Sequence, residues 1–149
     1  MRAVILLAGV AALTLSACET LPDDDGLGPV ADTGNDCAVI AAVAKEHYRF
    51  NTTDNRPPPL KFEEGYSPRC DWSRYGLAFT AYDPDAPGDP RERARWVSFD
   101  RPVYDGRGAT VATGILHGPL AGMGYECRVI SGFAGWTVPE GSCRNTWVS

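Results

Sequence analysis

An apolar segment at the start of the chain decides how much of the sequence is left to fold. Residues 3–15 are almost wholly apolar, they follow the basic residue Arg2, and the small residues Ser16 and Ala17 come after them. This order is typical of a secretory signal peptide. A membrane-spanning helix needs about 20 apolar residues, and this segment is shorter. We therefore expect residues 1–17 to be removed on export, and one domain to form from the remainder.

The residues that end the leader indicate how the exported protein is held. Leu15-Ser16-Ala17-Cys18 resembles the lipobox of bacterial lipoproteins at all four positions. The resemblance implies diacylglyceryl transfer to the Cys18 thiol, cleavage before Cys18 and acylation of the new amino group. Several acyl chains hold a protein stably on a membrane, whereas one does not. Glu19 replaces the Asp that often marks inner-membrane retention in this family, so the resemblance implies an outer-membrane lipoprotein facing the periplasm. The alternative is an ordinary leader that holds a cysteine by chance.

Residues 18–35 predict a flexible, acidic tether. They contain Asp23-Asp24-Asp25 with several glycines and prolines, and few of their side chains could pack in a core. The chain as a whole has a formal net charge of −5 and no run of Lys or Arg. This balance argues against nucleic acid as a partner. The expected partners are the membrane, through the lipid on Cys18, and an envelope protein or peptidoglycan.

The remaining cysteines constrain the domain itself. They are Cys37, Cys70, Cys127 and Cys143. An even number in an exported protein predicts two disulfides, for which three pairings exist. We favour Cys37–Cys70 with Cys127–Cys143, because each bond closes a local loop.

Zinc is the alternative use of these cysteines. The spacing argues against it, because there is no Cys-x-x-Cys pair, and His47 and His117 lie far along the sequence from any paired motif. We therefore expect neither a metal nor a cofactor.

The hydrophobic pattern changes along the exported part of the chain. Asp36 can cap a helix, and apolar residues then recur at helical spacing before Pro57-Pro58-Pro59 forces extended backbone. Further on, apolar and polar residues alternate as in strands, near residues 77–82, 95–99, 110–117, 125–130 and 135–138, with a last short segment at 145–148. We predict a single α+β domain over residues 36–149, in which one N-terminal helix, 37–49, packs on an antiparallel β meander of about five strands.

The end of the chain carries a second, less specific pattern. A glycine-rich turn at Gly122-Met123-Gly124 leads to Tyr125, and Gly135-Trp136 and Trp147-Val148-Ser149 follow. Over roughly the last 30 residues this resembles the C-terminal hairpin of small uncharacterised secreted proteins of proteobacteria. The resemblance implies a fold and export, and no activity follows from it.

Residues suited to catalysis are sparse. His117 sits at an expected strand end, where carboxylates of a neighbouring strand could join it in an envelope hydrolase. His47 follows Glu46, but the second histidine of a His-Glu-x-x-His motif is missing. No Gly-x-Ser-x-Gly nucleophile elbow is present. We therefore assign no catalytic residue, and expect a non-catalytic binding or envelope-structure role, with the hydrolase as the alternative.

Residues 83–90 are the best candidate for a binding loop. The opening Asp83-Pro84-Asp85 is like that of a calcium loop, but the required glycine and the closing bidentate Glu are absent, and three prolines stiffen the segment. Asp85 and Asp89 are the candidate binding residues, and an enzyme inhibitor that presents this loop is a third hypothesis. The four tryptophans are expected in the core, unless they gather at the surface as a glycan- or protein-binding patch.

Overall fold

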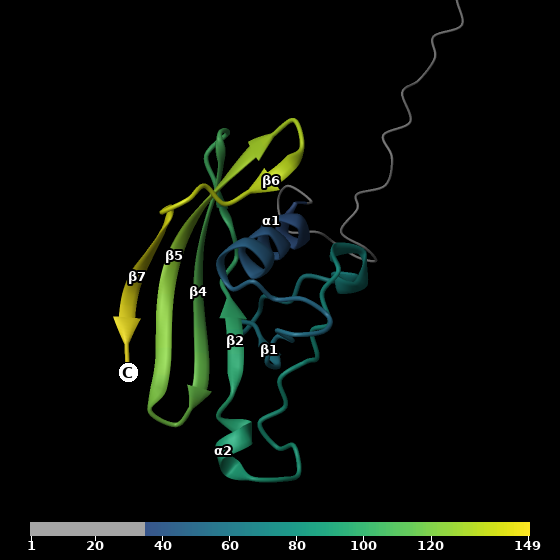
Figure 1. Ribbon diagram of the computed structural model, residues 1–149, viewed down its shortest axis with the longest axis vertical. Coiled ribbons are helices and arrows are strands. Elements are labelled where there is room, and N and C mark those ends of the chain that lie inside the picture. Colours follow the sequence, from purple (N-terminus) through teal and green to yellow (C-terminus); the bar gives the residue numbers. More distant parts are fainter. Residues whose placement is uncertain (1–34) are drawn as a thin grey trace, which may run out of the picture.

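A seven-stranded mixed sheet organises the computed structural model, which describes residues 35–149 (Figure 1). The expectations for the signal peptide, for Cys18 and for the tether up to residue 34 lie outside the described residues. In chain order the elements are α1 (Asp36–Ala42), η1 (Val43–His47), β1 (Leu60–Lys61), η2 (Trp72–Tyr75), α2 (Pro90–Arg93), β2 (Trp96–Phe99), β3 (Val103–Tyr104), β4 (Gly108–Gly118), β5 (Ala121–Gly132), β6 (Gly135–Thr137) and β7 (Cys143–Val148).

The long hairpin of β4 and β5 forms the centre of the sheet. The strand order is β1-β2-β4-β5-β6, with β3 paired to β4 and β7 paired to β5. The strands β2, β4, β5, β6 and β7 form at the expected segments, and their pairs are antiparallel. β1 pairs in parallel with β2, so the sheet is mixed, and the expected count of about five strands is wrong.

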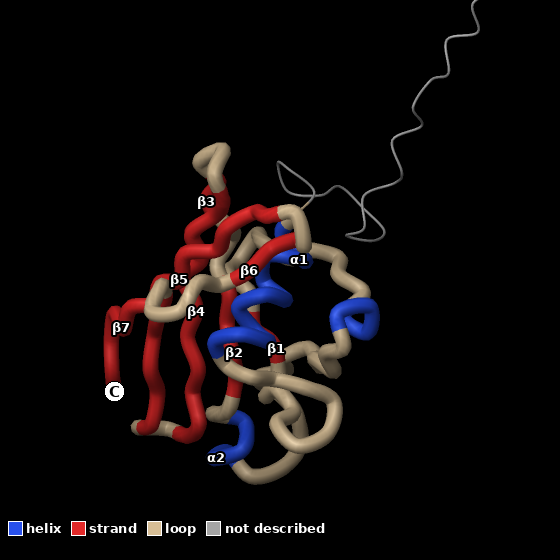
Figure 2. Tube along the Cα trace, turned by 45° about the horizontal axis from the view of Figure 1, so that its top comes forward, coloured by secondary structure: helices blue, strands red, loops and turns tan. Residues whose placement is uncertain are grey.

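One face of the sheet is buried, and the other meets solvent. Figures 1 and 2 show β4, β5 and β7 on one side of the molecule, and the helices with the long irregular segments on the other. Alternate side chains of the strands enter the core and meet those of α1 and η1. The largest fully buried apolar members are Val39, Ile40, Val43, Val97, Phe99, Val111, Cys127 and Val129. Burial of each aliphatic or aromatic side chain contributes about 1.5–3 kcal/mol to the stability of the fold. Because only one face of the sheet is buried, apolar residues alternate with polar ones along the strands.

The N-terminal helix differs from the expectation in length and in packing. α1 ends at Ala42, and the chain continues to His47 as a π-helical turn. Apart from η1, which continues it, the elements that the α1 backbone contacts most are β6 and η2, so α1 does not lie along the middle of a meander. Among the described helices, none combines the length and the apolar character that a membrane crossing needs.

The start of α1 is fixed by a buried carboxylate. Asn35 occupies the N-cap position, and Asp36 is the first helical residue, so the expected cap at Asp36 is wrong. The Asp36 side chain is fully buried, and accepts hydrogen bonds from the hydroxyls of Tyr66 and Tyr104, both at 2.7 Å. Both carboxylate oxygens are therefore engaged in joining the helix to two distant segments.

Both expected disulfides are present. Cys37–Cys70 joins α1 to the irregular segment before η2, and Cys127–Cys143 joins β5 to β7 at directly opposed positions. The structure thus confirms a domain of short helices and a sheet with this pairing of the four cysteines.

Residues 48–95 contain little regular structure. Strand-like alternation at residues 77–82 predicts a strand there, but only an isolated bridge forms, between Leu60 and Ala81. Backbone hydrogen bonds from Leu60 to Thr80 and from Tyr82 to Leu60 fasten this segment. The partner strand β1 is only two residues long and directly follows three prolines, which have no N–H to donate. The ladder therefore does not extend on the N-terminal side of β1.

Candidate functional site

Two backbone exceptions meet where the helical segment ends. η1 is a π-helical turn, and Arg49 has a φ of 61°, the one positive φ of a non-glycine residue among residues 35–149. The side-chain amide of Asn55 donates to the carbonyls of Tyr48 and Arg49 at 2.9 and 3.2 Å, and so holds this turn. π-turns and left-handed non-glycine residues concentrate at functional sites, so the surface beside this turn is a candidate site.

A recess of about 700 Å³ opens beside this turn. Its wall is mainly polar, and its lining residues are Glu46, His47, Arg49, Val138, Pro139, Glu140, Gly141 and Cys143. The Glu46 carboxylate accepts a hydrogen bond from the backbone N–H of Val138 at 2.7 Å. This bond fixes η1 against the segment that leads from β6 to β7.

His47 is half-buried at the edge of this recess. Its ring packs edge-on against Tyr48 and Tyr125, with ring centroids 4.7 and 4.4 Å apart. Burial lowers the pKa of His47 below its ordinary value of 6.5. The imidazole is therefore neutral at neutral pH, and one ring nitrogen is available to accept a proton or to bind a metal.

The Cys127–Cys143 disulfide lies next to this imidazole. A ring nitrogen of His47 and the Sγ atoms of Cys127 and Cys143 all lie within 4.8 Å of one another. Cys127 is fully buried, whereas Cys143 lines the recess. In the part of the chain that the structure describes, these are the only three metal-ligating side chains that gather in this way.

The sequence did not reveal this cluster. His47 is remote from both cysteines along the sequence, as the spacing argument stated, but its ring lies beside them in space. Antiparallel pairing of β5 and β7 sets the two cysteines opposite one another, and the π-turn brings His47 to Tyr125 on the same strand. No spacing rule contains this information, because it depends on the packing of the helix end.

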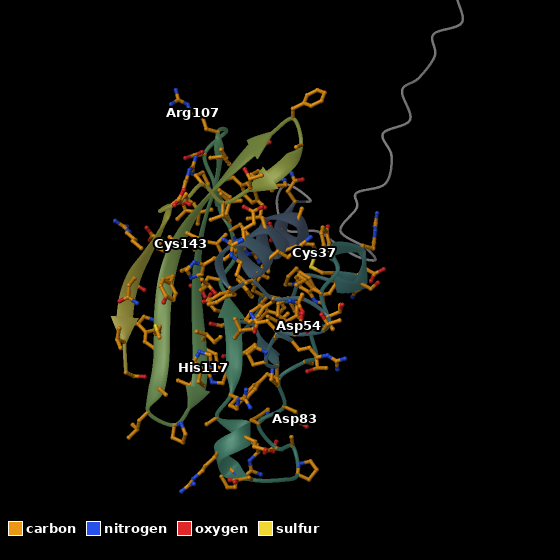
Figure 3. The ribbon with its side chains drawn as sticks, viewed as in Figure 1. Cys37, Asp54, Asp83, Arg107, His117 and Cys143 are labelled. Atoms are coloured by element: carbon orange, nitrogen blue, oxygen red, sulfur yellow. A yellow bond between two sulfur atoms is a disulfide. The ribbon has the colours of Figure 1, made fainter. Side chains whose placement is uncertain are left out.

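His117 stands apart from this cluster. It is exposed near the end of β4 (Figure 3), and it lines neither the recess at His47, nor the recess beside loop 83–90, nor the one between residues 56–59 and α2. A hydrolase built on His117 requires a concave site around this side chain. None of these recesses supplies one.

The carboxylates of loop 83–90 organise the loop itself. Asp83 accepts a hydrogen bond from the N–H of Asp85, and Asp89 caps α2 by accepting from the N–H of Arg91, both at 2.9 Å. The Arg93 guanidinium donates to the carbonyl of Ala86 at 3.0 Å. Asp85 is exposed at the tip, while Asp89 has a structural role as a helix cap.

The glycine-rich end of the β4–β5 hairpin accommodates Trp147. A Cβ at Gly124 would lie 1.8 Å from the indole nitrogen of Trp147, and a Cβ at Gly122 or Gly114 would lie 3.0 Å from its ring. Trp147 therefore packs on the sheet through glycines, and is partly exposed on the face opposite the core. These glycines therefore allow the close approach of the Trp147 indole to the sheet.

Comparison with known proteins adds no assignment. No protein-family model, no curated protein and no solved structure matches this chain.

Proposed function

We propose that this protein is an envelope lipoprotein, anchored through Cys18 to the outer membrane, whose periplasmic domain binds a partner and does not catalyse a reaction. The residues Leu15-Ser16-Ala17-Cys18 support the anchor. The two disulfides support an oxidising compartment, because such bonds are rare in reducing ones. A tether over residues 18–35 reaches about 25 Å on average, which lets the domain meet an envelope protein or peptidoglycan near the membrane.

Loop 83–90 is the observation that carries the binding role. It is exposed, yet it is ordered from within by its aspartates, by Arg93 and by three prolines. A loop that is already ordered loses little conformational entropy on binding, so its contacts translate more fully into affinity. An inhibitor that presents a rigid loop to an enzyme is the more specific form of this proposal.

The anchor is tested by intact-mass measurement on protein extracted from membranes of its native host. The expected mass is that of a chain beginning at Cys18 plus acyl groups, and reduction should add four hydrogens for two disulfides. A chain without acyl mass would remove the lipoprotein from the proposal.

The binding loop is tested by photo-crosslinking in intact cells. A photoreactive residue replaces Asp85 at the loop tip. A matched variant carries the same residue at position 54 in place of Asp54, an exposed acidic residue on the connection between η1 and β1. We expect a discrete adduct from position 85 and none from position 54. The absence of an adduct at position 85, or identical adducts from both positions, would contradict the role of the loop.

A further inference from the structure

We propose that Cys127, Cys143 and His47 form a zinc site when the disulfide between the two cysteines is reduced. Two thiolates and one imidazole make a ligand set that zinc enzymes use, with a fourth position left open. In the oxidised protein the sulfurs are bonded to each other, so the site is closed. The state of this disulfide therefore decides whether the ion can bind.

The backbone would keep the three ligands together after reduction. Cys127 and Cys143 are direct partners on β5 and β7, and the adjoining pair Glu126 and Arg144 is joined by a hydrogen-bonded ion pair. The N–H of Arg128 also donates to the carbonyl of Ser142 at 3.0 Å. These bonds do not depend on the disulfide, so the cysteines stay opposite one another when it opens.

His47 is fixed independently of the cysteines. Its ring is packed between Tyr48 and Tyr125, and the neighbouring Glu46 is bonded to the Val138 N–H. Zinc binds sulfur at about 2.3 Å and nitrogen at about 2.0–2.1 Å, so tetrahedral ligands lie about 3.5–4 Å apart. The ligand atoms already lie within 4.8 Å of one another, and rotation of the cysteine side chains supplies the remaining adjustment.

The chemistry balances with a dithiol as reductant. The dithiol gives two electrons and two protons, the Sγ–Sγ bond breaks, Cys127 and Cys143 become thiols, and the reductant becomes its own disulfide. Zinc then releases both thiol protons to solvent and accepts the lone pair of the unprotonated His47 nitrogen. The recess that Cys143 lines gives the ion a path from solvent, and gives water access to the fourth position.

The experiment measures metal binding by the full chain before and after reduction. The protein is reduced with a dithiol, which is then removed without oxygen, and Zn²⁺ affinity is measured by competition with a chromophoric chelator. Co²⁺ replaces Zn²⁺ in a parallel titration, because its absorption reports thiolate ligands directly. His47→Ala is compared with wild type. His117→Ala is the matched control, since His117 is exposed near the hairpin end of β4, away from Val111, which is the partner of Cys127 on that strand.

We expect the reduced wild type and the His117→Ala variant to bind Zn²⁺ equally, with a thiolate-to-cobalt absorption band. His47→Ala should bind at least about 10-fold more weakly. The oxidised protein should show no thiolate band. A Cys37→Ala/Cys70→Ala variant, if it folds, should retain one ion per chain, because the site cysteines Cys127 and Cys143 are then its only cysteines besides Cys18.

Equal Zn²⁺ affinity of the reduced wild type and His47→Ala would overturn the proposal. This outcome includes unfolding on reduction, because an unfolded chain binds the ion through its cysteines whether or not His47 is present. Failure of the reduced wild type to bind Zn²⁺ would overturn it equally. The His47 comparison is made in the otherwise unaltered chain, so it decides the matter even if the Cys37→Ala/Cys70→Ala variant does not fold.

Discussion

The two disulfides lie in regions that are held together in different ways. Residues 96–149 form a nearly continuous antiparallel ladder, in which Cys127–Cys143 joins strands that are already hydrogen-bonded. Residues 48–95 have only β1, η2 and α2, and there Cys37–Cys70 ties an irregular segment to the helix. Cys127–Cys143 thus reinforces existing secondary structure, whereas Cys37–Cys70 takes the place of backbone pairing. Because the β5–β7 hydrogen bonds hold these strands in register without Cys127–Cys143, this disulfide can be reduced while the strands stay paired. We therefore assign the redox-dependent site to Cys127–Cys143.

Removal of Cys37–Cys70 should have the largest effect. Its cysteines are 33 residues apart. Loop-closure entropy for such a span is worth about 4 kcal/mol, so Cys37→Ala/Cys70→Ala should lower the free energy of unfolding by about that amount. Denaturant titration measures this loss, and limited proteolysis should cut first within residues 48–95. First cleavage within residues 121–149 would reverse the comparison.

Removal of Cys127–Cys143 should cost less and leave the fold intact. The separation of 16 residues corresponds to about 3 kcal/mol by the same argument. Because the β5–β7 hydrogen bonds remain, Cys127→Ala/Cys143→Ala should keep the circular dichroism of the wild type. Loss of the sheet signal, at a temperature where the Cys37→Ala/Cys70→Ala variant stays folded, would show that β7 depends on its covalent bond.

The same contrast explains what could be predicted from the sequence. Strands such as β4 and β5 are joined by a tight turn, so their alternation and their partner are both local, and residues 110–117 and 125–130 reveal them. Residues 77–82 alternate in the same way, but their only partner is the short strand β1. Alternation reports which side chains can face a core, and it does not report whether a partner strand exists.

The candidate site was hidden for a related reason. The pairing of Cys127 with Cys143 follows from a local loop, and was predicted correctly. The position of His47 beside these cysteines depends on where the π-turn ends and on the packing of α1 against β6. The signal in the sequence was only a histidine one turn beyond the buried residue Val43, and this places it near the rim of the core without naming its neighbours.

Loss of the buried carboxylate should come next in size. Asp36→Ala leaves the buried hydroxyl of Tyr66 and the partly buried hydroxyl of Tyr104 without this acceptor. An unsatisfied buried polar group costs about 1–3 kcal/mol, so the loss should be about 2 kcal/mol or more. Denaturant titration measures it, and Asp54→Ala, an exposed residue, is the control. Stability equal to that of the control would mean that the hydrogen bonds to Asp36 do not stabilise the irregular part of the chain, residues 48–95.

A smaller effect should appear at alkaline pH. Burial, followed by the hydrogen bond to Asp36, raises the pKa of Tyr66 well above its ordinary value of 10.0. The folded state therefore holds this proton more tightly than the unfolded state, so the contribution is complete below pH 10 and is lost as the pH rises above it. Denaturant midpoints from pH 8 to 11 should fall above about pH 10, and should fall less steeply in Tyr66→Phe. Parallel curves for the two proteins would contradict this role for Tyr66.

The smallest effect should come from the well-ordered sheet. In Gly124→Ala the new methyl would collide with the Trp147 indole, so the ring must leave its place on the hairpin. Trp147 is already partly exposed, so its displacement should cost about 1 kcal/mol, well below full burial of an aromatic side chain. Tryptophan fluorescence should shift to longer wavelength while the denaturant midpoint changes little. Gly132→Ala is the control, because a Cβ there would meet only a carbonyl oxygen at 3.7 Å. A loss of stability as large as that of Asp36→Ala would mean that Trp147 on the outer face of the sheet contributes to stability as much as the buried carboxylate. The two regions would then differ less in how much their side-chain contacts stabilise them.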